Sequence, residues 1–380
     1  MHIIIVSTAY PLRGGIAHYN ALLASHLSKR HTVETITFKR QYPGLLFPGK
    51  TQKESGGVSQ PDDVAPAPQL LDSINPFNWI RVAKEIRRRQ PDLLIFKYWL
   101  PFFGPCFGTI AKFAKRDNKT KVIFICDNVI PHERRPGDIA FTKYAFKQAD
   151  YFIVQSDAVA QELLHYFPAA QYRKAPHPVF EIFGASMIKS AARQELGIAA
   201  KNVILYFGYV RRYKGVMVLL EAVQHLRQWQ SEIGETLLLV VGEFYDDEQK
   251  YRQRARELNL DSCVRFVADY VPNEHVARYF GAADVVTLPY LSATQSGIAQ
   301  IAYNFDKPVI ATNLGGLTEV VLHEKTGFLV PPNEPRALAE AIRRFYREHR
   351  ENEFSENVKI EKRKYSWERV VEAIEELVSV

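Results

Sequence analysis

Short apolar runs alternate with helix-length amphipathic segments along nearly the whole chain, and this alternation constrains the fold more than any other feature. The apolar runs are His2–Ser7, Val33–Phe38, Leu93–Lys97, Val122–Cys126, Tyr151–Gln155, Val203–Phe207, Leu237–Val241, Val264–Val267, Asp284–Leu288 and Val309–Ala311. A run that is hydrophobic almost throughout is typical of a strand in a parallel sheet with helices on both faces. We therefore predict an α/β fold built from doubly wound parallel sheets.

The alternation pauses between Tyr172 and Lys201, where the chain has two prolines and no strong periodicity. Its 380 residues suit two domains of ordinary size. We predict an N-terminal Rossmann-like domain over residues 1–175, a linker over 176–189 and a C-terminal Rossmann-like domain over 190–355. Residues 356–380 are expected to include an amphipathic helix with a packing role, and the N-terminal domain is one surface on which it can pack.

One long segment, Lys39–Asn75, shows no clear element and holds several prolines, glycines and polar residues. A loop of this length inside a compact domain is usually functional or mobile. The sequence leaves both interpretations open.

Charge and cysteine usage narrow the class of protein. Lys and Arg number 49 against 42 Asp and Glu, a net charge of +7, which fits an ordinary surface or a basic face for an anionic ligand or membrane. Nucleic acid is not an expected partner, because the sequence has no zinc-finger spacing, basic zipper or aromatic RNA-binding signature. The apolar runs are too short to span a bilayer. Three widely spaced cysteines form no metal site and fit a cytoplasmic location.

A glycine-rich turn follows the first predicted strand. Gly14 and Gly15 precede a helix whose apolar positions Ile16, Tyr19 and Leu23 share one face. Glycines at such a turn let the backbone approach a ligand, and the helix N-terminus favours negative charge. The turn lacks the GxGxxG pattern, so a simple tight turn is the alternative.

Three more candidate ligand loops lie in the second predicted domain. Arg211 and Lys214 stand on a loop between a strand and a helix, where they suit a diphosphate, although a solvated basic loop is the plain alternative. Thr294–Gly297 is a small polar turn at a predicted strand end, and Asn313–Glu319 is a second glycine-rich turn with a carboxylate. Ligands of open α/β sheets bind at that edge, where a helix N-terminus offers N–H groups to phosphate oxygens.

The order of these motifs resembles the retaining, GT-B-fold glycosyltransferases of family 4. The motifs are GGI near the start, RRYKG after the first strand of the second domain, the small-residue turn, KPVIATNLGGLTEVV and TGFLVPP. The resemblance covers nearly the whole chain, and the second half carries its more specific motifs. It implies two Rossmann-like domains facing across a cleft, a nucleotide-sugar donor on the C-terminal domain, an acceptor on the N-terminal domain, and no metal or other cofactor.

The resemblance also assigns roles to residues. Lys214 matches the lysine that binds the donor diphosphate, and Arg211 is the best candidate for its paired arginine, although Tyr209 holds the place where that arginine often stands. The remaining matches to donor-binding turns of the family are Gly14, Gly15, Gly316 and Glu319.

The sequence departs from the family pattern at the donor site. The family has two glutamates separated by seven residues, and a gapless count puts Ala293 and Ile301 at those positions. The expected donor contacts therefore fall to the neighbouring residues Thr294, Gln295, Ser296 and Gly297.

A second departure concerns the catalytic residues. Asp127 stands where related sequences often have a histidine near the reacting sugar, while His132 is retained. Asp127 is expected to bind a sugar hydroxyl or to stabilise developing positive charge, and a turn residue is the alternative. For His132 the alternative is a structural loop histidine.

The resemblance favours transfer of a sugar from a nucleotide-sugar donor to a glycan or lipid-linked acceptor, with retention at the anomeric carbon. A nucleotide-sugar 2-epimerase, or a sugar-nucleotide-binding protein with weakened catalysis, is the alternative. The basic amphipathic segment Phe77–Arg89 and nearby aromatic residues favour peripheral contact with the cytoplasmic membrane face. Against this, Trp79, Val82, Ala83 and Ile86 have the spacing of an ordinary core stripe.

Overall fold

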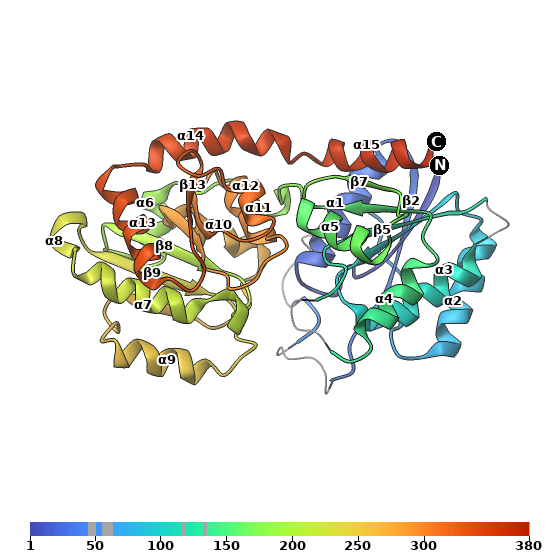
Figure 1. The fold of residues 1–380 in the computed structure, drawn as a ribbon, viewed down its shortest axis with the longest axis horizontal. Coiled ribbons are helices and arrows are strands. Elements are labelled where there is room, and N and C mark those ends of the chain that lie inside the picture. Colours follow the sequence, from blue (N-terminus) through green and yellow to red (C-terminus); the bar gives the residue numbers. More distant parts are fainter. Residues whose placement is uncertain (45–50, 55–63, 116–118, 132–134, 380) are drawn as a thin grey trace. The chain divides into compact units, whose positions relative to one another are not determined.

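The computed structural model describes residues 1–44, 51–54, 64–115, 119–131 and 135–379, and the chain divides into two compact units. Unit 1 consists of Met1–Pro178 and Ser366–Val380, and unit 2 of Val179–Tyr365. Figure 1 labels the elements of both units. The chain passes between the units at Pro178–Val179, which lies within the segment predicted as a linker, and again at Tyr365–Ser366.

Unit 1 is built, within the described residues, on a seven-stranded parallel sheet of order β3-β2-β1-β4-β5-β6-β7. The strands are β1 His2–Val6, β2 Thr32–Arg40, β3 Gln69–Asp72, β4 Leu93–Tyr98, β5 Lys121–Cys126, β6 Tyr151–Val154 and β7 Tyr172–Lys174. Every residue of the central strand β4 is buried, as expected for an apolar run covered on both faces.

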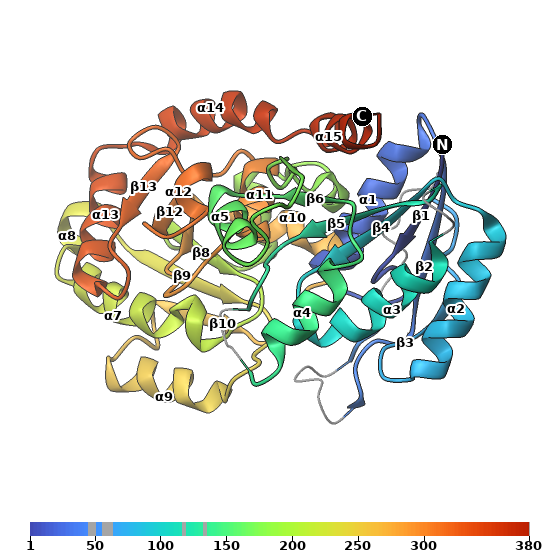
Figure 2. The ribbon, with the colours of Figure 1, turned by 45° about the vertical axis from the view of Figure 1, so that its right-hand side comes forward.

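Helices cover both faces of this sheet. They are α1 Gly15–Ser28, α2 Pro76–Arg89, α3 Gly104–Ala114, α4 Asp138–Phe146, α5 Asp157–Tyr166 and α15 Trp367–Val378. α2, α3 and α4 lie side by side (Figure 2) and share a core with Leu94 and Phe96 of β4. Because side chains alternate along a strand, Lys97 points to the other face, where it meets Tyr19 of α1. α15 packs on the same helix, with the rings of Trp367 and Tyr19 5.0 Å apart.

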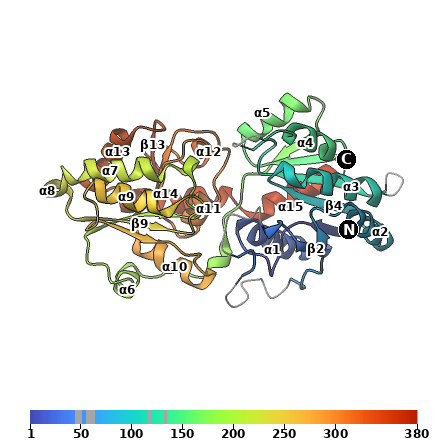
Figure 3. The same ribbon diagram turned by 90° about the horizontal axis from the view of Figure 1, so that it is seen from below.

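Unit 2 has, in the part of the chain that is described, a six-stranded parallel sheet of order β10-β9-β8-β11-β12-β13. The strands are β8 Asn202–Phe207, β9 Thr236–Val241, β10 Val264–Val267, β11 Val285–Leu288, β12 Val309–Thr312 and β13 Gly327–Val330. Its helices are α6 Lys189–Glu195, α7 Val216–Arg227, α8 Gln230–Ile233, α9 Glu248–Glu257, α10 Asn273–Ala282, α11 Gly297–Asn304, α12 Leu317–Val320, α13 Pro335–Arg347 and α14 Glu351–Glu361. α7 and α13 pack side by side on one face of the sheet (Figure 3).

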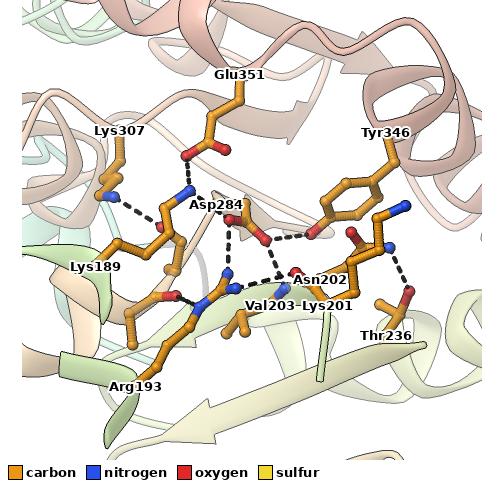
Figure 4. A network of polar contacts seen from close by, with 12 residues as sticks. Lys189, Arg193, Lys201, Asn202, Val203, Thr236, Asp284, Lys307, Tyr346 and Glu351 are labelled. Atoms are coloured by element: carbon orange, nitrogen blue, oxygen red, sulfur yellow. Dashed lines mark hydrogen bonds and ion pairs between the residues drawn. The ribbon is translucent and has the colours of Figure 1, made fainter. Parts of the chain in front are cut away.

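A polar network closes the amino ends of β8 and β11 (Figure 4). The Asp284 carboxylate accepts hydrogen bonds from Lys189 Nζ and Arg193 Nη2, each at 2.7 Å, and from the backbone N–H of Val203 at 2.7 Å. The buried Lys307 ammonium donates to the carbonyl oxygen of Ala283 at 2.8 Å. These bonds fasten α6 to the sheet, and they lie at the edge opposite the predicted ligand loops.

The predicted fold class is confirmed, since each unit is an α/β structure on its own parallel sheet. The sequence showed no clear element in Lys39–Asn75. In the structure, this segment contains the edge strand β3. Residues 45–50 and 55–63 of this segment lie outside the described part of the chain.

Candidate functional site

The strand order of the unit 2 sheet reverses between β8 and β11, because β9 lies on one side of β8 and β11 lies on the other. Ligands of open α/β sheets bind at such a switch point. The loops after these two strands touch, and the backbone N–H of Leu291 donates to the carbonyl oxygen of Tyr213 at 2.6 Å. Gly215 permits this approach, because its φ is 70° and an added Cβ would lie 1.8 Å from the carbonyl oxygen of Pro289.

Two cations stand on the β8–α7 loop. The Arg211 guanidinium lies over the ring of Tyr245, 4.8 Å from its centroid, and Lys214 Nζ lies 5.5 Å from the centroid of Tyr290. Burial, followed by repulsion from Arg211, lowers the pKa of Lys214 to about 8. Among the residues that the structure describes, neither cation forms an ion pair with a carboxylate. Both are therefore held by aromatic faces and are available to an anionic ligand.

The predicted polar turn forms the start of α11, beside these cations. The Ser296 hydroxyl caps the helix by accepting from the backbone N–H of Ala299 at 3.4 Å. The side chain of Ile298, in the first turn, lies 3.0 Å from the position of a Cβ built on Gly208, and Lys214 Nζ lies 3.5 Å from the same point. Thr294, Gln295, Ser296 and Gly297 thus belong to one loop next to Lys214, and their contact with a donor stays a prediction.

The second glycine-rich turn packs against this loop. The backbone N–H of Gly316 donates to the carbonyl oxygen of Thr294 at 3.1 Å. The sequence singled out Gly316, but Gly315 is the residue with the stricter requirement, because its φ is 41° and an added Cβ would lie 2.1 Å from the carbonyl oxygen of Ala293. Glu319 is half-buried in α12, and its backbone carbonyl accepts from the hydroxyl of Tyr365 at 3.2 Å.

The predicted residues of unit 1 lie at the carboxyl edge of its own sheet. Gly14 has a φ of 104° and begins α1, and a Cβ added to Gly15 would meet no atom within 4 Å. Asp127 directly follows β5 and is 7% exposed. The structure thus divides the predicted residues, with Gly14, Gly15 and Asp127 in unit 1 and the others in unit 2. His132 lies outside the described residues.

Asp127 has a partner that the sequence analysis missed, the fully buried Lys97 at the end of β4. The two side chains form an ion pair, and the Lys97 ammonium also lies 3.7 Å from the ring centroid of Tyr19. Burial lowers the pKa of Lys97, and the Asp127 charge opposes that shift. Burial and the charge of Lys97 lower the pKa of the neighbouring His177 to about 4, so its ring is neutral at pH 7. A lysine inside the apolar run LLIFK was the signal available.

Two further features concern the part of the chain that the structure describes. No group of three or more His, Cys, Asp or Glu side chains in this part of the chain is arranged to hold a metal ion. No helix there is both long enough and apolar enough to cross a membrane.

Comparison with known proteins covers both units. Residues 13–179 match the family described as Glycosyltransferase Family 4, and residues 201–348 match Glycosyl transferases group 1. A D-inositol 3-phosphate glycosyltransferase from Pseudarthrobacter chlorophenolicus is 26% identical over 355 residues, which cover 88% of this chain and 82% of the relative. Relatives of the same name are 30% and 31% identical over shorter stretches, and the chain spans about half of their length.

Solved structures show the same architecture. Sucrose-phosphate synthase from Thermosynechococcus elongatus matches with a TM-score of 0.75 and 21% identity, covering 99% of this chain and 98% of that one. Anabaena HepE in complex with UDP-glucose matches with a TM-score of 0.73 and 18% identity, covering all of both chains. The fold is that of the GT-B glycosyltransferases. With family matches over residues 13–179 and 201–348, the chain belongs to the family 4, or group 1, glycosyltransferases.

Proposed function

We propose that this protein transfers a sugar from a nucleotide-sugar donor to an acceptor hydroxyl, with retention at the anomeric carbon. The observation that carries the proposal is the pair of cations, Arg211 and Lys214, at the switch point of the unit 2 sheet. The family match and the UDP-glucose bound to HepE, a protein of the same fold, support a nucleotide-sugar ligand.

The unit 2 site is suited to stabilising the leaving group. When the bond between sugar and diphosphate breaks, negative charge grows on the diphosphate oxygens. Arg211 and Lys214 oppose that charge from fixed positions, and the N-terminus of α11 adds backbone N–H groups. Gly208, Gly215 and Gly315 let the loops that carry these groups lie close together.

In unit 1, we assign the acceptor side of the reaction to the neighbourhood of Asp127. Its carboxylate can accept a hydrogen bond from a sugar hydroxyl or stabilise positive charge on the reacting sugar. Lys97 is the positioning residue, because the ion pair fixes the direction of the carboxylate. His132 stays a candidate on sequence grounds alone.

We also propose that the reaction needs no divalent metal or other cofactor, because Arg211 and Lys214 already supply positive charge for the diphosphate. The test is activity in EDTA. Activity that EDTA abolishes and Mg²⁺ or Mn²⁺ restores would contradict this part of the proposal.

One incubation tests the function as a whole. The protein is mixed with nucleotide sugars, with and without candidate acceptors, and the products are separated. Transfer to an acceptor with an unchanged anomeric configuration is expected. Release of free nucleotide with an epimerised sugar would identify a 2-epimerase, and binding without turnover would identify a sugar-nucleotide-binding protein.

For the acceptor, we propose a glycan or lipid-linked molecule reached at the cytoplasmic membrane face. One face of α2 packs in the core of unit 1, as expected from the spacing of its apolar residues. Val82, Ala83 and Ile86 are buried there, and the indole N–H of Trp79 donates to the carbonyl oxygen of Asp72. The outer face of α2 is nevertheless basic. Its exposed basic and aromatic residues are Phe77, Arg81, Lys84, Arg87 and Arg88.

An anionic lipid surface is the partner that this face fits, because lysine and arginine beside an exposed aromatic ring attract acidic head groups. Co-sedimentation with phosphatidylglycerol vesicles tests the contact. Binding should fall with added salt and with charge reversal at Arg87 and Arg88. Absence of binding at low salt would favour an acceptor away from the membrane.

A further inference from the structure

Gln300 on α11 is a buried amide without partners. Its side chain belongs to a residue that is 1% exposed, yet neither Nε2 nor Oε1 has a hydrogen-bond partner among the residues that the structure describes. Burial of an unsatisfied polar group destabilises the fold, and nearly all buried polar groups in folded proteins are paired. A glutamine that keeps both of its polar atoms unpaired therefore points to a partner outside the chain.

The position of Gln300 identifies that partner. It lies three and four residues after Gly297 and Ser296, in the second turn of the eight-residue helix α11. Helical side chains lean toward the helix N-terminus, so Gln300 covers the turn that contains Ser296 and Gly297. The Ser296 hydroxyl in that turn lies 3.2 Å from the hydroxyl of Tyr290, and the ring of Tyr290 lies beside Lys214, which is assigned to the donor diphosphate.

We propose that the Gln300 carboxamide binds a hydroxyl group of the nucleotide-sugar donor, an inference that rests on the proposed function. A hydroxyl both donates and accepts, and the amide offers one group of each kind. A phosphate would use only Nε2. The hydroxyl belongs either to the ribose or to the transferred sugar, and both sources share this chemistry.

The test replaces Gln300 with methionine, which keeps the length of the side chain and removes both polar atoms. Without nucleotide, the melting temperature of Gln300→Met should stay the same or rise, because an unsatisfied buried group has been removed. Its affinity should fall about tenfold for whichever of UDP, ADP or GDP binds the wild type best, or for the glucose conjugate of that nucleotide. Affinity for inorganic pyrophosphate, which has no sugar hydroxyl, should not change.

Tyr303→Phe is the matched control, one turn further along the same helix. The Tyr303 hydroxyl is buried but satisfied, since it donates to the carbonyl oxygen of Val320 at 2.8 Å and lies 2.7 Å from Thr326 Oγ1. Its removal should lower the melting temperature and leave nucleotide affinity unchanged. The two variants are thus expected to give opposite results in the two measurements.

The outcomes separate the sources and the hypotheses. A loss already seen with the nucleoside diphosphate places Gln300 on the ribose, and a loss seen only with the glucose conjugate places it on the transferred sugar. If Gln300→Met binds the nucleoside diphosphate and its glucose conjugate as tightly as the wild type does, the inference is overturned while the proposed function stands. If the methionine variant does not fold, Gln300→Leu serves as the test variant in the same measurements. If the wild type binds no nucleoside diphosphate, the proposed function fails and this inference fails with it.

Discussion

The two units place lysines at the carboxyl edges of similar parallel sheets but surround them differently. In unit 1, Lys97 is fully buried and ion-paired with Asp127. In unit 2, Lys214 lies 5.5 Å from the ring centroid of Tyr290, and the neighbouring Arg211 lies over the ring of Tyr245. A lysine neutralised by a carboxylate attracts phosphate weakly, whereas two cations on aromatic faces attract it strongly. We therefore expect an anion site in unit 2, whereas unit 1 holds a charge-neutral pair at the same edge of its sheet.

Loss of Lys97 should have the largest effect, and it should act on stability. Lys97→Met leaves the buried Asp127 carboxylate without its lysine, which should lower the free energy of unfolding by about 3–5 kcal/mol. The double variant Lys97→Met/Asp127→Asn should lose clearly less, because no buried charge remains. Urea unfolding measures both, and a cost for Lys97→Met no greater than that of the double variant would show that the pair is not the source of the effect.

Loss of Lys214 should act on binding instead. Lys214→Met should weaken binding of a nucleoside diphosphate by roughly 1.5–3 kcal/mol, the range for hydrogen bonds to charged groups. Its ligand-free melting temperature should not fall, because burial disfavours this ammonium. Calorimetry and thermal unfolding give the two values. Unchanged affinity, or a large loss of stability as for Lys97→Met, would erase the difference between the two lysines.

Because the pKa of Lys214 is lowered, we expect the affinity of unit 2 for a diphosphate to depend on pH. Below pH 8 the lysine is already protonated and diphosphate binding needs no proton. Above pH 8 the free protein must take up a proton to bind, so affinity should fall about tenfold between pH 7 and pH 9. Calorimetry in buffers of different ionisation enthalpy should detect that uptake. Lys214→Met should show a flat profile over this range, and an equally steep profile in the variant would assign the titration elsewhere.

The smallest expected difference between the units concerns two serines that cap helices. Ser296 caps α11 in unit 2, and Ser156 caps α5 in unit 1 by accepting from the N–H of Val159 at 3.3 Å. Replacement of either by alanine should cost about 1 kcal/mol of stability. Only Ser296→Ala should also weaken nucleotide binding, because only its helix begins at the proposed diphosphate site. Equal nucleotide affinity in the two variants would remove the α11 turn from that site.

The sequence predicts strands well where they are covered on both faces. The runs Leu93–Lys97 and Val203–Phe207 became the central strands β4 and β8. The edge strands β3 and β7 were missed, because they are short and incompletely buried and so carry no continuous apolar run. The edge strand β13 was also missed, since it has only four residues and begins with a glycine.

The site was predictable only as far as local motifs reach. Lys214 and Thr294 could be proposed as ligand-binding residues because loops between strands and helices mark the ligand edge of α/β sheets. The contact of Lys97 with Asp127 depends on the register of β4 against β5, in which Lys97 lies opposite Ile125, and a single sequence does not reveal register. Gln300 was not recognised, because an amide in an amphipathic helix has no signal until its burial and lack of partners are known.

We expect the cations of unit 2, and not the charged pair of unit 1, to bind the donor. Calorimetric titration with UDP, ADP and GDP of two double variants tests it most directly. Lys97→Met/Asp127→Asn should bind the preferred nucleotide as the wild type does and lose sugar transfer, while Arg211→Met/Lys214→Met should lose nucleotide binding with its fold intact. Full nucleotide binding by the folded Arg211→Met/Lys214→Met variant would contradict the account.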